Sequence, residues 1–176
     1  MQSWKKISSK VILDHPRLKV LEDTVELPNG KITDYLKFEN MGRVATIICR
    51  NNEGKFLLQK EYSYPPDEVL FHFPGGAVSF EEDIEKGANR ELMEEAKYRA
   101  NKLILLGNYL RNNRRSGAQC YVFLGTDLVE EKKQEDDEEI IESYWFTEEE
   151  IENMIMNNEI KDVSILAAWS LYKAKK

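Results

Sequence analysis

Apolar and polar residues alternate along the first part of the chain, from Val11 to Phe38, on both sides of the sequence Leu-Pro-Asn-Gly at residues 27–30. Alternation with a period of two is typical of a strand with one buried face, and Asn-Gly is a strong hairpin signal. The pattern therefore predicts an N-terminal antiparallel β-hairpin region.

Further along the chain, β-rich apolar runs are separated by turns and charged segments. They predict strands at RVATIIC (43–49), KFLLQKEY (55–62), VLFHF (69–73), KLILLGNYL (102–110), AQCYVFLGTDL (118–128) and EIIESYWF (139–146). Helical periodicity predicts a helix from Phe80 to about Lys97, a second opened by a capping box of Thr147 and Glu150, and a third from about Asp162 to Lys175. This order favours an α/β sandwich built on a mixed sheet.

The length of 176 residues is enough for one sizeable core, and no repeat or linker divides the sequence. We expect a single domain over residues 1–176, with an N-terminal β region at 1–40 and a core at 41–176. The net charge of −7 argues against non-specific binding of nucleic acid. Cys49 and Cys120 lie in apolar runs, which indicates reduced core thiols. No apolar run has membrane-spanning length, so we expect a cytoplasmic protein with no membrane partner.

The sequence RELMEEA at residues 90–96 contains only good helix formers. On a helix, Glu91, Glu94 and Glu95 fall within a sector roughly 100° wide. Two carboxylates at that spacing repel by about 3 kcal/mol at an effective dielectric near 20, and by under about 1 kcal/mol in open water. The sector is therefore either a solvated acidic surface or a place where cations bind.

An apolar stripe of Ala88, Leu92 and Ala96 beside the glutamates favours the second interpretation, because it places them at the edge of a packed face. Mg²⁺ suits such a site, since it takes a few carboxylate oxygens and completes its shell with water and substrate phosphates. Arg90 is positioned to pair with Glu94 one turn later and to fix carboxylate rotamers. Gly75, just upstream, leaves its carbonyl open to a metal.

The segment GAVSFEEDIEKGANRELMEEAKY resembles the Nudix box. The residues in register with the family pattern are Gly76, Glu82, Arg90, Glu91, Leu92, Glu94, Glu95 and Tyr98. Lys97 stands where the family usually has Gly. The segments LPNGKITDY, LLQKEYSYPPDEVLFHFPGG and EEIIES extend the resemblance to the ADP-ribose pyrophosphatase branch, although Ser63 replaces the branch's Arg and NYLRNNRRSG lacks its Pro.

This resemblance implies a Nudix-type α/β/α sandwich that hydrolyses the diphosphate of a nucleoside diphosphate linked to a group X, with ADP-ribose cut to AMP and ribose 5-phosphate. It implies Mg²⁺, or Mn²⁺ in its place, held by the Gly75 carbonyl, Glu91, Glu94, Glu95 and Glu82. Glu82 also fits a capping box with Ser79, so its role stays open. Glu94 and Arg90 would act in catalysis. Glu139, beside Asp137 and Glu138, is the candidate base.

Substrate contacts are less specified by the sequence. Arg111, Arg114 and Arg115 either hold substrate phosphates or balance an acidic surface. Tyr62, like Tyr64 and Trp4, either stacks on a base or belongs to the core. His15 and His72 have no metal-ligand spacing, and we assign them no metal role.

The resemblance also bears on partners, and two alternatives to the implied function remain open. The resemblance implies a small-molecule nucleotide partner and a homodimer paired through the segment from Val11 to Phe38. A different substrate within the same chemistry would be another nucleotide sugar, a dinucleotide or a dinucleoside polyphosphate. A Nudix-fold sensor that binds without cleaving is the non-enzymatic alternative, but sensors are expected to lose acids of the box, and all are present here.

Overall fold

A computed structural model describes residues 2–39, 42–131 and 141–176 of the chain. The chain divides into two compact units. The N-terminal unit comprises Met1–Met41 with Asn112–Ala118, and the core unit comprises Gly42–Arg111 with Gln119–Lys176. That the whole chain forms one domain stays a prediction. None of the helices that the structure describes is long and apolar enough to cross a membrane.

The N-terminal unit is an antiparallel sheet in the order β1-β2-β3, formed by β1 (Lys5–His15), β2 (Leu18–Glu26) and β3 (Ile32–Phe38). The predicted turn joins β2 to β3: Gly30 takes φ +81°, and its N–H donates to the carbonyl of Leu27 at 2.9 Å. The hairpin prediction is confirmed. The first strand, however, begins at Lys5, earlier than the alternation indicates.

Asp23 is a buried carboxylate in this sheet, with 6% of its surface exposed. Its carboxylate lies 2.7 Å from the Lys37 ammonium and accepts a 2.5 Å hydrogen bond from the Ser9 hydroxyl. The hydrogen bond from Lys37, followed by that from Ser9, lowers the pKa of Asp23 below its usual value. A depressed carboxyl pKa stabilises the folded state above the unfolded pKa, and this stabilisation is lost as the pH falls through the folded pKa.

Asp23→Asn should therefore lower the free energy of unfolding at pH 7 by about 1–3 kcal/mol, because the Lys37 and Ser9 donors lose an anionic acceptor. The deficit should shrink once the pH falls below about 4, where the wild-type carboxyl also takes up a proton. Urea unfolding of the wild type and Asp23→Asn from pH 7 to pH 2 measures this difference in the free energy of unfolding. Asp34→Asn, at an exposed position on β3, is the control and should change stability little. An equal deficit at pH 2 and pH 7 would refute this account of Asp23.

The core unit contains two sheets. The larger is mixed, in the order β7-β4-β9-β8, and contains β4 (Arg43–Cys49), β7 (Ala77–Val78), β8 (Tyr98–Leu110) and β9 (Gln119–Glu130). Within it β4 and β9 are parallel, and the other pairs are antiparallel. The smaller is antiparallel, in the order β10-β5-β6, with β5 (Phe56–Ser63), β6 (Glu68–His72) and β10 (Glu142–Phe146). The predicted strands are thus found, with β10 described from residue 142 onward.

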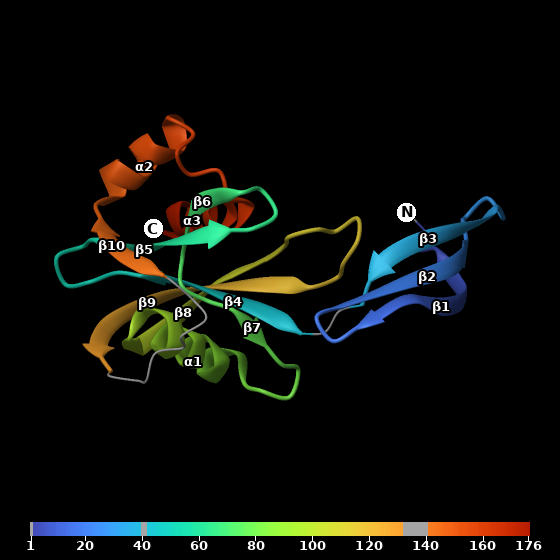
Figure 1. Ribbon diagram of the computed structural model, residues 1–176, viewed down its shortest axis with the longest axis horizontal. Helices are drawn as coiled ribbons and strands as arrows, with labels where there is room; N and C mark the ends of the chain where they lie inside the picture. Colours follow the sequence, from blue (N-terminus) through green and yellow to red (C-terminus); the bar gives the residue numbers. More distant parts are fainter. Residues whose placement is uncertain (1, 40–41, 132–140) are drawn as a thin grey trace. The chain divides into compact units, whose positions relative to one another are not determined.

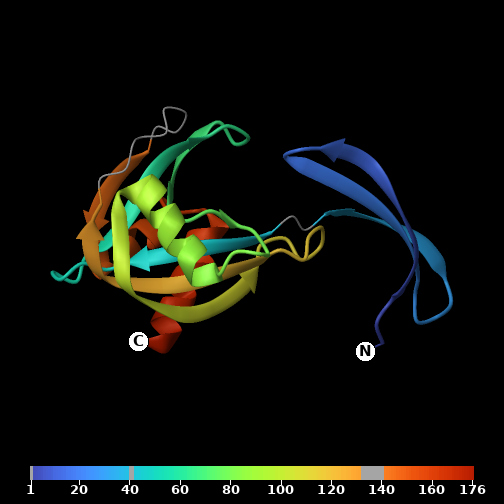
Figure 2. The same ribbon diagram turned by 90° about the horizontal axis from the view of Figure 1, so that it is seen from below.

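Helices cover both faces of the mixed sheet, and this confirms the predicted α/β fold (Figure 1; Figure 2). Helix α1 (Ile84–Ala96) packs on β4, β7 and β8, whereas α3 (Val163–Lys175) packs on the opposite side, where α2 (Glu148–Met156) also lies. Along β4, Ala45, Ile47 and Cys49 enter the core cluster under α1, and Ile48 enters the cluster that includes α3. A strand buried on both faces explains why RVATIIC is nearly continuous in apolar residues.

The start of α1 differs from the sequence prediction. The helix begins at Ile84, and Asp83 is its N-cap, accepting hydrogen bonds from the N–H groups of Glu85 and Lys86. Ser79 does accept a bond from the Glu82 N–H at 3.2 Å, but the Glu82 carboxylate binds Arg90 instead of returning to a cap. The capping-box interpretation of Ser79 and Glu82 is therefore wrong. The predicted box of Thr147 and Glu150 at the start of α2 is confirmed.

Helix α1 ends at Ala96, and its C-cap residue Lys97 takes the left-handed conformation with φ 61°. This is the position where the Nudix pattern has Gly, and a left-handed L-residue costs roughly 1–2 kcal/mol. Lys97→Gly should raise the free energy of unfolding by about 1 kcal/mol. Lys102→Gly, within β8, is the comparison and should lower it by roughly 0.5–1 kcal/mol. Chemical denaturation measures both. A loss of stability in Lys97→Gly would show that the left-handed turn carries no strain.

Candidate active site

The carboxylates of α1 and of the segment before it converge on Arg90. Its Nη1 lies 2.7 Å from Glu91 and donates to Glu94 at 2.9 Å. Its Nε and Nη2 each donate to Glu82 at 3.1 Å. The predicted pairing of Arg90 with Glu94 is present, and the guanidinium also binds two further carboxylates. Arg90 therefore offsets much of the repulsion expected between the neighbouring glutamate carboxylates.

Two glycines let the backbone approach this cluster. The Gly75 N–H donates to the Glu95 carboxylate at 2.9 Å, and a Cβ on Gly75 would lie 2.0 Å from the Ala45 carbonyl oxygen. A Cβ on Gly76 would lie 2.3 Å from Oε2 of Glu91. The Glu91 carboxylate therefore occupies space that only a glycine leaves open. The buried Gln59 adds a contact at the helix end, donating to the Glu95 carbonyl at 3.1 Å.

Arg43 holds the segment that carries Glu82 in place, and no local sequence pattern predicts this contact. Its guanidinium, at the start of β4, donates to the carbonyl of Ser79 at 2.8 Å and to the carbonyl of Glu82. These bonds satisfy backbone groups that a helix would otherwise use, which explains why the helix starts only after Asp83. Glu82 is thereby presented to Arg90 from outside the helix.

The environments of these carboxylates differ. Burial raises the pKa of Glu91, and the neighbouring Arg90 offsets this only in part. The hydrogen bond from Arg90 lowers the pKa of Glu82, and the same contact raises the pKa of Arg90. Glu91 is thus held in a place that disfavours its charged form unless more positive charge is supplied.

Among the described residues, no three Asp, Glu, His or Cys side chains are already arranged around a common metal position. The carboxylates gather on Arg90 instead. The donor set nevertheless fits a hard divalent cation, because it consists of carboxylate oxygens and because Gly76 leaves room for the partly buried Glu91. Of the predicted ligands, Glu82, Glu91 and Glu94 meet on Arg90. Glu95 and Gly75 form a separate contact, and Gly76, the next residue, lies beside the Glu91 carboxylate.

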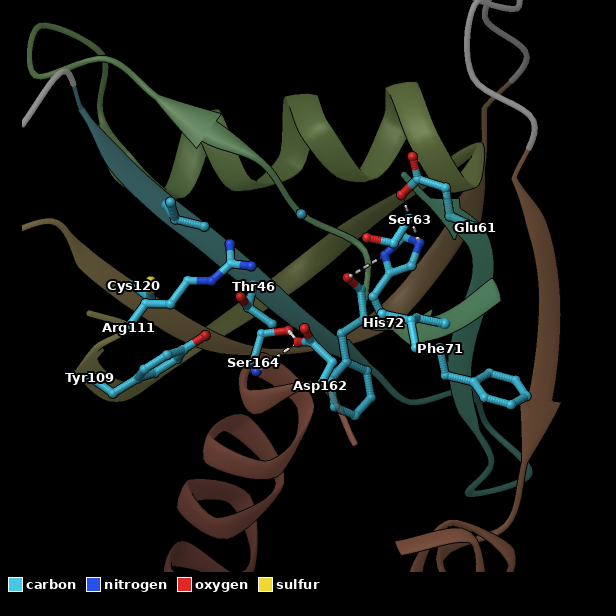
Figure 3. A pocket seen from close by; sticks show the side chains of 14 residues that line it. Thr46, Glu61, Ser63, Phe71, His72, Tyr109, Arg111, Cys120, Asp162 and Ser164 are labelled. Carbon is cyan, nitrogen blue, oxygen red and sulfur yellow. Dashed lines mark hydrogen bonds and ion pairs between the residues drawn. The ribbon is translucent and has the colours of Figure 1, made fainter. Parts of the chain in front are cut away.

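A pocket of ≈ 230 Å³ adjoins the cluster at Gly75 (Figure 3). It is bounded by strands of both core sheets and by the start of α3. Its polar lining consists of Thr46, Glu61, Ser63, His72, Tyr109, Arg111, Asp162 and Ser164. In Figure 3, Glu61, Ser63 and His72 lie together on one side, and Tyr109 and Arg111 lie on the other.

The predicted substrate residues are distributed unevenly. Arg111 lines the pocket. Tyr62 is 52% exposed and donates to Asp67 at 2.8 Å within the turn between β5 and β6. Arg114 and Arg115 belong to the N-terminal unit, where the Arg114 carbonyl accepts a bond from Tyr35 and the Arg115 guanidinium donates to the Leu36 carbonyl. Glu139, with Asp137 and Glu138, lies outside the described residues.

Comparison with known families shows which family the chain belongs to. The family model described as NUDIX domain matches residues 41–168, so the chain belongs to the Nudix family. A second model, described as nucleoside diphosphate sugar hydrolase N-terminal domain, matches residues 4–35. The chain is a Nudix pyrophosphohydrolase, and enzymes of this family generally use a divalent metal.

The chain is also similar to individual proteins. The chain is 28% identical over 160 residues to an ADP-ribose pyrophosphatase of Bacillus subtilis (strain 168), covering 90% of this chain and 86% of the relative. It is 31% identical over 99 residues to a methanol dehydrogenase activator of Bacillus methanolicus, covering 56% and 53% of the two chains. The crystal structure of an ADP compounds hydrolase matches with a TM-score of 0.89 at 18% identity, covering 99% of this chain and 94% of that one, and this likeness supports the fold.

Proposed function

We propose that the protein hydrolyses the diphosphate linkage of a nucleoside diphosphate joined to a group X, with ADP-ribose as the substrate and AMP and ribose 5-phosphate as products. The observation that carries this proposal is the gathering of Glu82, Glu91 and Glu94 on Arg90, beside the Glu95–Gly75 contact. Its support from relatives is the similarity to an ADP-ribose pyrophosphatase over most of both chains.

Mg²⁺, or Mn²⁺ in its place, would be held by Glu91, Glu94 and Glu95, with Glu82 and the Gly75 carbonyl in supporting roles. When bound, such ions neutralise the charge on the diphosphate and orient the attacking water. The carboxylate oxygens of this chain are hard ligands of the kind these ions take.

Other residues would position the carboxylates, bind the substrate or accept a proton. Arg90 holds the Glu82 and Glu94 carboxylates in defined rotamers through the bonds described above, which makes it a positioning residue. Arg111 would hold a substrate phosphate at the pocket. Glu139 is the proposed general base that takes a proton from the attacking water. Roles for Tyr62, Arg114 and Arg115 in substrate binding stay predictions, as does the cytoplasmic location.

The experiment that tests this function is a panel of nucleoside diphosphate compounds, assayed with Mg²⁺ and with Mn²⁺, with both products identified by mass. The panel includes ADP-ribose, ADP-glucose, NADH and a diadenosine polyphosphate. We expect ADP-ribose to give AMP and ribose 5-phosphate. If ADP-ribose is inert while another compound is cleaved, the substrate proposal is wrong and the Nudix chemistry stands.

We also propose a homodimer in which the N-terminal sheet contacts the second subunit. Every residue of β1 is exposed, and this strand carries Ile7, Val11 and Ile12, each with about half of its surface open (50%, 51% and 51%). Contiguous exposed apolar side chains mark interaction surfaces.

Light scattering at micromolar concentration should give twice the chain mass of 20.6 kDa. Ile7→Asp should lower that mass and Ser8→Asp should not; a wild-type mass near 20.6 kDa would refute the dimer.

A further inference from the structure

The pocket beside Gly75 contains a pair of side chains whose hydrogen-bonding capacity is incomplete. Nε2 of His72 is buried and has no hydrogen-bond partner among the residues that the structure describes. Oε2 of Glu61 lies 3.6 Å away, which is too long for a good hydrogen bond. Figure 3 shows the two side chains facing each other at one side of the pocket. A buried polar atom without a partner calls for an explanation, and a bound ligand group supplies one.

The other nitrogen of His72 fixes what this pair can bind. Nδ1 lies 3.2 Å from the Phe73 carbonyl oxygen, and a carbonyl can only accept, so Nδ1 carries a proton. In the neutral ring Nε2 is then an acceptor. Glu61 presents a carboxylate, which is also an acceptor. Two acceptors side by side match a ligand with two neighbouring donors, and they do not match the acceptor oxygens of a phosphate.

We propose that Glu61 and His72 bind adjacent hydroxyl groups of the sugar in X, and that this pocket is the sugar subsite of the enzyme. The inference rests on the proposed function, which places the diphosphate at the neighbouring α1 cluster. Gly75 lies between the pocket and helix α1, since it lines the pocket and its N–H donates to the Glu95 carboxylate. The volume of ≈ 230 Å³ is below the range of about 300–1,000 Å³ for pockets that enclose whole drug-sized ligands, as expected for a subsite that takes one sugar.

The test uses the histidine ring signals in the NMR spectrum of the metal-free protein. The chain has only two histidines, so His15, in the N-terminal unit, is an internal control. Titration with ribose 5-phosphate should shift the His72 signals and leave those of His15 unchanged. Inorganic phosphate, which can reach Arg111 but offers no pair of hydroxyl donors, should shift the His72 signals much less than ribose 5-phosphate does and should leave His15 unchanged. 2-Deoxyribose 5-phosphate, which lacks one of the neighbouring hydroxyls, should bind about tenfold more weakly or worse, because an acceptor then loses its donor.

Matched variants test the carboxylate. Glu61→Gln keeps the size of the side chain and should weaken ribose 5-phosphate binding about tenfold. Glu68→Gln, on β6, is the control, because Glu68 pairs with Lys161 and does not line the pocket. Equal responses to inorganic phosphate and ribose 5-phosphate, equal affinity for the deoxy sugar, or a silent His72 would each overturn the proposal. Because binding is measured without turnover, an inactive enzyme that still binds ribose 5-phosphate at His72 would refute the proposed function alone.

Discussion

Replacing Glu91 with Gln is expected to reduce the rate of diphosphate hydrolysis by about 100-fold or more, while the metal-free protein becomes no less stable than wild type. The activity falls because a proposed metal ligand loses its negative charge, and metal ions contribute several kcal/mol to such reactions, at about 1.4 kcal/mol for each factor of ten. Stability is preserved because burial already disfavours the charged carboxylate, as its raised pKa shows.

Activity assays and thermal melts in chelator and in excess Mg²⁺ measure both effects. The Mg²⁺-induced rise in melting temperature should shrink in Glu91→Gln, since weaker binding gives less stabilisation by mass action. Glu85→Gln, an exposed position in the first turn of α1, is the control and should behave as wild type. If Glu91→Gln keeps wild-type activity and the same Mg²⁺-induced shift, the glutamate face is only a solvated surface.

Replacing Arg90 with Met is expected to lower the metal-free free energy of unfolding by about 2–4 kcal/mol and to reduce activity. Three carboxylates contact the guanidinium, with the shortest distance of 2.7 Å to the partly buried Glu91. Removing one partner of a buried pair leaves an uncompensated charge, which costs about 3–5 kcal/mol when fully buried, and somewhat less here because Arg90 is 37% exposed.

A second substitution separates charge from packing. Adding Glu82→Gln to the Arg90→Met protein should recover part of the lost stability, because it removes one of the repelling carboxylates. Lys86→Met, at an exposed position on the same helix, should change stability by less than about 0.5 kcal/mol. Urea unfolding in chelator measures the wild type, Arg90→Met, Glu82→Gln, the double mutant and Lys86→Met. Additive losses in the double mutant would show that Arg90 acts through its packing and not by neutralising the carboxylates.

The local pattern of the sequence was enough to predict most of the helices and strands and the glutamates on one face of α1. Period-two alternation and Asn-Gly identified the hairpin of β2 and β3, and the spacing of glutamates on one helix face brought Glu91, Glu94 and Glu95 together. Such features depend on residues within a few positions of one another, so the sequence displays them directly.

The features that the sequence did not reveal depend on contacts between distant segments. The spacing of Ser79 and Glu82 matches that of a capping box. Arg43, however, 36 or more residues earlier, donates hydrogen bonds to carbonyls that a longer helix would use. His72 reaches the pocket because β5 and β6 pair in a register that opposes Gln59 to His72. Its partner Glu61 is on the neighbouring strand, and no local pattern marks that pairing.

The central claim is that the carboxylate face of α1 binds the divalent ion used for diphosphate hydrolysis. Titration of chelator-treated wild type and Glu91→Gln with Mn²⁺, with free Mn²⁺ followed by electron paramagnetic resonance, tests it most directly. The account predicts a saturable Mn²⁺ site in the wild type that is lost or strongly weakened in Glu91→Gln and unchanged in Glu85→Gln. Equal Mn²⁺ binding by the wild type and Glu91→Gln would contradict it.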